Sequence, residues 1–258
     1  MIDYISPSPV DFCRWGDKRK VITMDFDYIE QGDCLELMKT IPDESVHLVV
    51  TDCPYHIVAG GCTNKGKGNG IFQRENASSG KLFAHNEIDF SEWLPEVFRI
   101  LKPDSHCYIM VNGRNLKELW QAAEQAGFNF QNLLVWEKGN VTPNRYYMNA
   151  CEFILMLRKG KAKTINNAGT SNLIRVKNPV GKKNHPTEKP VELMEVLVVN
   201  STNPGDIVLD PFLGSGTTAI AAVNTGRHYI GFELDPGYFD IACKRLDEAE
   251  GKVTHAVL

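Results

Sequence analysis

The feature that most constrains the fold is a strand, a glycine-rich turn, a helix and a second strand within residues 206–233. The apolar run before Asp210 predicts a buried strand, and the run 228–232 predicts a second one that ends on Glu233. Gly214 and Gly216 lie where the helix begins, so the main chain can approach a ligand closely and present N–H groups to it. An acid at the tip of the next strand is placed to bind ribose hydroxyls. Although Gly-x-Gly alone occurs in many tight turns, the whole unit predicts a nucleoside-cofactor site.

The third glycine of the dinucleotide-binding fingerprint is absent from this unit. Ile220 lies near the position where that glycine would fall. A cofactor without a pyrophosphate therefore fits better, which speaks against a nucleotide-dependent oxidoreductase built on the same kind of sheet.

Strand-like and helical patterns alternate along the rest of the chain. We expect strands near 28–33, 46–50, 106–111, 133–136 and 152–157, and helices near 35–41, 92–101, 116–126, 191–200, 219–224 and 236–249. This alternation favours an α/β fold with a mostly parallel, doubly wound sheet covered on both faces. We expect an irregular arm over residues 1–22 and one domain over residues 23–258.

A second stretch with chemical potential is Thr51-Asp52-Cys53-Pro54-Tyr55, which directly follows the apolar run 46–50. The carboxyl ends of parallel strands form the edge at which α/β proteins bind ligands. A carboxylate that accepts hydrogen bonds, next to an aromatic ring that stacks, suits a flat ring bearing nitrogen.

Two polar segments are candidates for contact with a phosphate backbone. The glycine-rich loop 56–86 follows Asp52 and carries mainly positive charges, so we interpret it as a lid that also contacts DNA rather than as a surface insertion. Residues 158–189 are strongly basic although the whole chain has a net charge of −4. The candidate DNA-binding residues in these segments are Lys65, Lys67, Arg74, Lys177, Lys182 and Lys183.

Composition argues against several other classes of protein. None of the seven cysteines forms Cys-x-x-Cys or pairs with histidine at zinc-like spacing, so we expect free thiols and no metal site. No apolar run approaches the length of a membrane span, and no signal peptide is evident, so we expect a cytoplasmic protein without a membrane partner.

Three motifs together resemble the amino-group DNA methyltransferases, which methylate adenine N6 or cytosine N4. The stretch 51–55 is similar to their Asp-Pro-Pro-Tyr signature, and Asp-Pro-Phe-Leu-Gly-Ser-Gly-Thr-Thr (210–218) is similar to their S-adenosylmethionine loop. The stretch 185–190, His-Pro-Thr-Glu-Lys-Pro, resembles the element before that loop in the circularly permuted subgroup whose catalytic motif comes first. The resemblance covers about residues 27–246.

The resemblance implies a seven-stranded, mostly parallel Rossmann-like sheet with a small basic target-recognition insertion over residues 158–184. It implies a site-specific DNA methyltransferase of the restriction–modification type that uses S-adenosylmethionine, and it is compatible with a homodimer. The implied catalytic residues are Asp52, Cys53, Pro54 and Tyr55. The implied cofactor-binding residues are Asp33, His185, Thr187, Lys189, Asp210, Phe212, Gly214, Ser215, Gly216, Thr217 and Glu233.

Within that family, Asp52 would accept one N–H of the target amine and the main-chain carbonyl of Cys53 would accept the other, while Tyr55 stacks on a base flipped out of the duplex. Asp rather than Ser at position 52 resembles the adenine-N6 members more than the cytosine-N4 members. Cys53 departs from the family by replacing a proline, so a catalytically impaired DNA-binding homologue is an alternative, as is N4-cytosine methylation. A methyltransferase that acts on RNA or protein is a further alternative, although the basic segment argues against a protein substrate.

Overall fold

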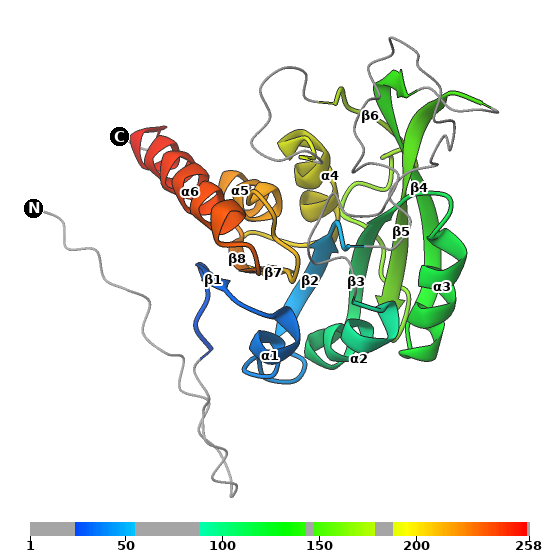
Figure 1. The fold of residues 1–258 in the computed structure, drawn as a ribbon, viewed down its shortest axis with the longest axis horizontal. Helices are drawn as coiled ribbons and strands as arrows, with labels where there is room; N and C mark the ends of the chain where they lie inside the picture. Colours follow the sequence, from blue (N-terminus) through cyan, green and yellow to red (C-terminus); the bar gives the residue numbers. More distant parts are fainter. Residues whose placement is uncertain (1–23, 55–87, 143–146, 179–187, 257–258) are drawn as a thin grey trace, which may run out of the picture.

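The computed structural model describes residues 24–54, 88–142, 147–178 and 188–256, which form one sheet with helices on both sides (Figure 1). The strands are β1 (Tyr28–Gln31), β2 (Val46–Thr51), β3 (Leu101–Val111), β4 (Asn129–Thr142), β5 (Asn149–Lys159), β6 (Leu173–Arg175), β7 (Ile207–Asp210) and β8 (His228–Glu233). The helices are α1 (Cys34–Met38), α2 (Phe90–Ile100), α3 (Leu116–Gln125), α4 (Val191–Ser201), α5 (Thr217–Asn224) and α6 (Pro236–Ala256). The expected arm 1–22 and loop 56–86 lie outside the described residues.

The sheet has the strand order β1-β8-β7-β2-β3-β5-β4-β6. Strand β5 runs antiparallel to its neighbours β3 and β4, and the other paired strands are parallel. The predicted α/β fold class is thereby confirmed, with eight strands in the described residues where seven were expected. The additional strand, β6, is three residues long and lies within the expected insertion 158–184, where the sequence predicted no strand.

Alternating side chains of β2 divide between two hydrophobic layers. Leu48 and Val50 pack with residues of α4, α5 and α6, whereas Val49 packs with residues of α1, α2 and α3. Figure 1 shows these two sets of helices on opposite sides of the sheet. A central strand that is apolar on both faces is what a doubly wound parallel sheet requires.

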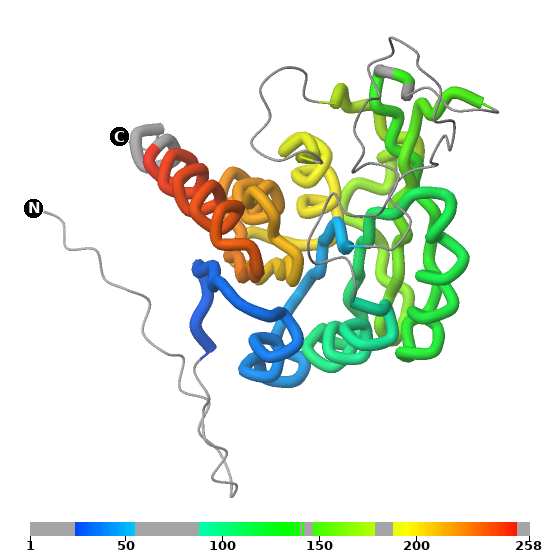
Figure 2. Tube along the Cα trace, viewed as in Figure 1, coloured from blue at the N-terminus to red at the C-terminus, as the bar shows by residue number. Residues whose placement is uncertain are grey.

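Strands β2 and β7 are neighbours in the sheet although about 160 residues of chain separate them. Figure 2 shows the chain running from the blue β2 through the green elements and returning, so that the orange segments of β7 and β8 lie beside it. The helices that follow, α2 and α5, pack on opposite faces. Such a change of direction opens a crevice at the carboxyl ends of the two strands, where ligands bind in this class of fold.

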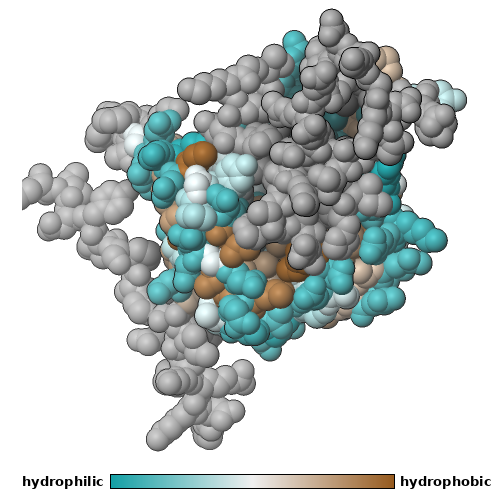
Figure 3. Space-filling model, viewed as in Figure 1, coloured by the Kyte–Doolittle hydropathy of each residue, from teal (hydrophilic) through white to brown (hydrophobic). Residues whose placement is uncertain are grey.

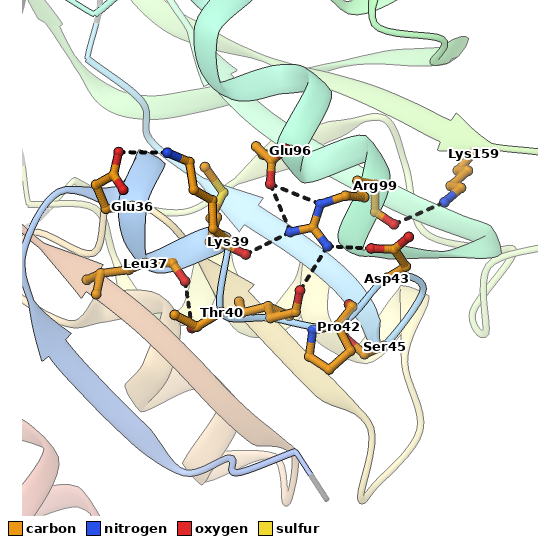
Figure 4. Close-up of polar contacts among 12 residues, drawn as sticks. Glu36, Leu37, Lys39, Thr40, Pro42, Asp43, Ser45, Glu96, Arg99 and Lys159 are labelled. Carbon is orange, nitrogen blue, oxygen red and sulfur yellow. Dashed lines mark hydrogen bonds and ion pairs between the residues drawn. The ribbon is translucent and has the colours of Figure 1, made fainter. Parts of the chain in front are cut away.

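Arg99, in the last turn of α2, fixes the turn that leads into β2 (Figure 4). Its guanidinium donates to the main-chain carbonyls of Met38 (2.8 Å) and Ile41 (2.9 Å). It also forms ion pairs with Asp43 (2.5 Å) and Glu96 (2.8 Å). The planar guanidinium satisfies several acceptors at once, so the entry to β2 is held against α2.

The strand boundaries differ from the expected ones mainly at β3 and β4. Strand β3 begins at Leu101 and includes Pro103, and its pairing with β2 is irregular between Val46 and Leu48. Strand β4 extends from Asn129 to Thr142, far beyond the expected 133–136. Pairing with β5 sustains this length, which local sequence does not reveal.

No helix in the described ranges is long and apolar enough to cross a membrane. In the space-filling view, hydrophilic residues dominate the described rim of the molecule, and a smaller apolar group lies near the centre (Figure 3).

Candidate active site

Asp52 directly follows β2, at the carboxyl edge of the sheet. Its side chain is 22% exposed, and its Oδ2 accepts a hydrogen bond from the Lys189 ammonium. Burial raises the pKa of Asp52 above its ordinary value, while the positive charge of Lys189 opposes this rise. The result is a carboxylate that is partly desolvated yet held in place, as an acceptor for a ligand N–H group should be.

Lys189 precedes α4, whose N-cap is Pro190, and its side chain is only 8% exposed. Besides Asp52, it faces Oε2 of Glu152 on β5 at 3.7 Å. Burial disfavours the charged form of Lys189, but the two carboxylates outweigh it, and the pKa of Lys189 is raised. The ammonium is therefore shared between acids from two different strands.

Cys53 points into the hydrophobic layer that contains α1 and α2 and is 2% exposed. Burial raises the pKa of the Cys53 thiol well above its ordinary value, and the nearby charge of Asp52 adds to that rise. A buried neutral thiol is a poor nucleophile. The side chain at position 53 therefore fills the core, and its main-chain carbonyl is the group available for chemistry.

The turn between β7 and α5 has the backbone that its glycines permit. Gly214 and Gly216 have φ values of +57° and +86°, a region that residues with side chains rarely adopt. A Cβ added at Gly214 would meet no described atom within 4 Å, whereas one at Gly216 would lie 3.2 Å from Cβ of Ala242. Gly216 is thus required by packing against α6, while Gly214 leaves open space at the surface of the turn.

Glu233 closes this turn from the end of β8. Its carboxylate accepts hydrogen bonds from the main-chain N–H groups of Gly214 (2.7 Å) and Asp235 (2.8 Å). Burial raises the pKa of Glu233, and these two hydrogen bonds oppose the rise. Carboxylate oxygens can each accept more than one hydrogen bond, so Glu233 retains capacity for a ligand. An open glycine turn beside such an acid fits a nucleoside-bearing cofactor.

Asp33 lies beside Glu233 because β1 pairs with β8 in the register Gln31↔Glu233. The main-chain N–H of Gly32 donates to the carbonyl of Glu233 at 2.9 Å. The Asp33 carboxylate caps α1 by accepting from the N–H of Leu35 (2.9 Å). The structure therefore brings together the two acids that the sequence placed at the ends of different strands.

Asp210 is 4% exposed and makes only internal contacts among the described residues. It accepts hydrogen bonds from the hydroxyls of Thr51 and Thr218, each at 2.7 Å, and from the N–H of Phe212 at 3.1 Å. Burial raises the pKa of Asp210 to about 6, although these hydrogen bonds oppose the rise. This arrangement ties the end of β2 to the glycine turn and indicates that Asp210 organises the site.

The remaining residues of the turn are also anchored from outside it. Phe212 packs edge-on against Trp93 of α2, with ring centroids 5.1 Å apart. Ser215 receives two hydrogen bonds from Arg245 of α6, to its carbonyl (2.6 Å) and its hydroxyl (2.8 Å). Arg245 also pairs with Glu188 at 2.9 Å, which connects the stretch before α4 to the glycine turn.

Several predicted site residues lie outside the described part of the chain: Tyr55, Lys65, Lys67, Arg74, Lys182, Lys183, His185 and Thr187. Lys177 lies in the described part of the chain, and its side chain is beside Gly139 of β4. In the described ranges, no group of three or more His, Cys, Asp or Glu residues could hold a metal ion.

Sequence reasoning missed Glu152 and Arg245, both of which contact predicted site residues. Glu152 lies on β5 opposite Trp136 and meets Lys189 from the stretch before α4, a contact between segments distant in sequence. Arg245 is one of many charged residues of α6, and no motif distinguishes it.

Comparison with known proteins gives consistent matches. The family model N6_N4_Mtase, described as DNA methylase, matches residues 46–244. The chain is 34% identical over 245 residues to the Type II methyltransferase M.HinfI of Haemophilus influenzae, covering 85% of this chain and 68% of that protein. It is 32% identical over 244 residues to the Type II methyltransferase M2.DpnII of Streptococcus pneumoniae, covering 86% and 89% respectively.

A solved structure agrees with the sequence matches. The crystal structure of the M1.HpyAVI–SAM complex superimposes with a TM-score of 0.63 and 29% identity, covering 84% of this chain and 98% of that one.

Proposed function

The chain belongs to the N6/N4 DNA methylase family of S-adenosylmethionine-dependent DNA methyltransferases, and from this premise we propose that it methylates the exocyclic N6 amine of adenine at specific DNA sites. The observation that carries the proposal is Asp52, a partly buried carboxylate at the end of β2, next to the glycine turn of β7. Asp rather than Ser at this position resembles the adenine-N6 members of the family.

The proposed chemistry depends on the hydrogen bond that Asp52 accepts from the target amine. The lone pair of that amine is delocalised into the base, which makes it a poor nucleophile. Asp52 accepts one N–H and the carbonyl of Cys53 accepts the other, which favours a pyramidal nitrogen with a localised lone pair. Bound S-adenosylmethionine supplies an electrophilic methyl group. The protein contributes mainly positioning and electrostatic stabilisation.

We assign the cofactor-binding roles to the turn and to the acids around it. Phe212, Gly214, Ser215, Gly216 and Thr217 would line the cofactor. Glu233 would bind the ribose hydroxyls, and Asp33 would lie near the adenine. His185 and Thr187 would lie near the amino-acid end. The contacts of Asp210 support a positioning role instead, because its carboxylate is engaged by Thr51 and Thr218.

The target base is proposed to leave the duplex, since a stacked base cannot reach a carboxylate at the sheet edge. Unstacking costs a few kcal/mol, roughly, and is offset by contacts in the pocket. Tyr55 would stack on the flipped base, and Pro54 would rigidify the turn that holds both. The loop 56–86 and the insertion 158–184 would hold the DNA backbone through Lys65, Lys67, Arg74, Lys177, Lys182 and Lys183. A homodimer is part of the same proposal.

Transfer of labelled methyl groups from S-adenosylmethionine to mixed-sequence DNA, followed by nucleoside analysis, tests the proposal. N6-methyladenine is the expected product. N4-methylcytosine would refute the choice of base while retaining the mechanism. DNA binding without label would favour the catalytically impaired alternative and direct attention to Cys53, for which Cys53→Pro is the restoring variant.

The role of Asp52 has its own test. Asp52→Ala should bind S-adenosylmethionine nearly as the unmodified protein does, because Asp52 lies outside the glycine turn, and it should lose methyl transfer. Asp33→Ala is the matched control, since it removes a carboxylate near the cofactor acid Glu233 and should weaken cofactor binding instead. An Asp52→Ala protein that still transfers methyl groups to DNA would refute the role assigned to Asp52.

A further inference from the structure

Four charged side chains of alternating sign form a continuous series that leads away from Asp52. Lys189 contacts Asp52 and lies 3.7 Å from Oε2 of Glu152. The other oxygen of Glu152, Oε1, accepts a hydrogen bond from Lys138 of β4 at 3.0 Å. Both lysines are largely buried, with side chains 8% and 10% exposed. Glu152 thus has one oxygen directed at each lysine.

We propose that Glu152 is a positioning residue for methyl transfer, which holds the Lys189 ammonium between two carboxylates so that Asp52 keeps its strength as a hydrogen-bond acceptor. This inference rests on the proposed role of Asp52 in binding the target amine. Glu152 contacts the Lys189 ammonium, which in turn contacts Asp52, so Glu152 acts through Lys189.

The physical reason is competition for one ammonium group. If Lys189 had Asp52 as its single carboxylate partner, the pair would neutralise each other, and Asp52 would accept a weaker hydrogen bond from the target amine. Glu152 is a second carboxylate beside the ammonium, so it competes with Asp52 for the positive charge of Lys189. Lys138 then balances the charge of Glu152, so that the series has two positive and two negative groups.

Backbone geometry explains why Glu152 can hold this place. It lies on β5 opposite Trp136 of β4, whose indole N–H donates to the carbonyl of Val176 at 2.7 Å. Lys138 is two residues further along β4, on the same face as Trp136. Glu152 is therefore fixed by a paired strand, a rigid base from which to position Lys189.

The charges that face Asp52 define the expected pH dependence. They are Lys189 from the stretch before α4, Glu152 from β5 and Asp210 from the neighbouring strand β7, beside the neutral thiol of Cys53. The negative charge of Glu152 raises the pKa of both Asp52 and Lys189. Removing that charge should lower the pKa of Asp52, which moves the acid limb of the rate profile to lower pH.

The experiment compares Glu152→Gln with Glu137→Gln in the full-length protein. Glu137 lies on the same hairpin and forms an ion pair with Arg175 at 2.8 Å, but it belongs to a different face and pair, so it is the matched control. Initial rates of methyl transfer are measured against pH at saturating DNA and S-adenosylmethionine, together with the Kd for S-adenosylmethionine. We expect Glu152→Gln to lower kcat by about 10- to 100-fold, as small misplacements of a reacting group do. The acid limb of the Glu152→Gln rate profile should lie at lower pH, and its Kd for S-adenosylmethionine should be unchanged. Glu137→Gln should match the unmodified protein in kcat, in the acid limb and in this Kd.

A second variant separates charge from folding. Glu152→Asp keeps the carboxylate, so its acid limb should remain near that of the unmodified protein even if kcat falls. An acid limb shifted as far as in Glu152→Gln, or an unchanged kcat and profile in Glu152→Gln, would overturn the inference. In contrast, absence of transfer by the unmodified protein would refute the proposed function itself.

Discussion

Two alanine substitutions in the glycine turn should separate cofactor binding from stability. Gly214→Ala and Gly216→Ala introduce the same side chain at positions two residues apart, and both residues have positive φ. At Gly214 the new methyl group would enter open space, whereas at Gly216 it would press on Ala242 of α6. The first change should therefore obstruct a ligand, and the second should disturb the fold.

The magnitudes follow from these surroundings. A left-handed backbone costs an L residue roughly 1–2 kcal/mol, part of which is offset by the lower entropy of the unfolded alanine chain, about 0.4–1 kcal/mol. Gly214→Ala should thus lower the free energy of unfolding by about 1 kcal/mol. At Gly216 the added Cβ would lie 3.3 Å from the main-chain Cα of Ala242, so backbone must move. Overpacking of this kind adds about 1–3 kcal/mol, for a total of roughly 2–4 kcal/mol.

Urea denaturation measures the free energy of unfolding, and calorimetric titration measures the Kd for S-adenosylmethionine. Gly214→Ala should weaken cofactor binding strongly with a small change in stability, while Gly216→Ala should have the larger loss of stability. Equal losses of stability in the two variants would refute the packing argument. An unchanged Kd in Gly214→Ala would show that the cofactor does not use the open space at that turn.

Three further predictions concern DNA contact, pH and the entry to β2. Neutralising Lys182 and Lys183 should weaken DNA binding and reduce its log–log salt slope by about 0.9 per lost phosphate contact; an unchanged slope in filter binding would remove them from the interface. Because the pKa of Asp210 is raised to about 6 in the folded state, the contribution of Asp210 to the free energy of unfolding is fully present below about pH 4 and is lost as pH rises through 6. Thr218→Val removes a hydrogen bond that opposes this rise in pKa, so the loss of free energy of unfolding relative to the unmodified protein, measured by urea denaturation, should grow from pH 4 to 8, and a constant difference would contradict the argument. Arg99→Lys should lower the free energy of unfolding by about 2 kcal/mol through loss of the planar contacts to two carbonyls, and a change below 0.5 kcal/mol, roughly, would refute its anchoring role.

The order of strands and helices could be predicted because each element carries its own local pattern. The run before Asp52 and the run before Asp210 are apolar on both faces, as central parallel strands must be. The strand β6 could not be predicted, since three residues give no periodicity and their pairing with β4 depends on contacts distant in sequence. The early start of β3 was missed for a local reason, because Pro103 lies within it and a proline normally interrupts a strand.

The site was predictable where it follows from short contiguous motifs. Asp52 and the glycine turn were found because the residue types and the strand that precedes them are adjacent in sequence. Lys189 was predicted among the cofactor-binding residues, and the structure places its ammonium beside Asp52 and Glu152. That contact requires knowing which strand lies next to which and in what register, information that a single sequence does not contain.

The adjacency of β2 and β7 has a consequence for the order in which the molecule is built during synthesis. The ribosome delivers β2 long before β7, so the strand that carries Asp52 has one open edge until the last fifth of the chain emerges. The hydrogen bond between Thr51 and Asp210, which joins residues 159 positions apart, can form only then. Closing so long a loop is slow compared with forming local contacts. In newly made chains, Asp52 and the glycine turn after β7 should therefore come together in one late step. A chain stalled before β7 lacks that turn and cannot form the complete site.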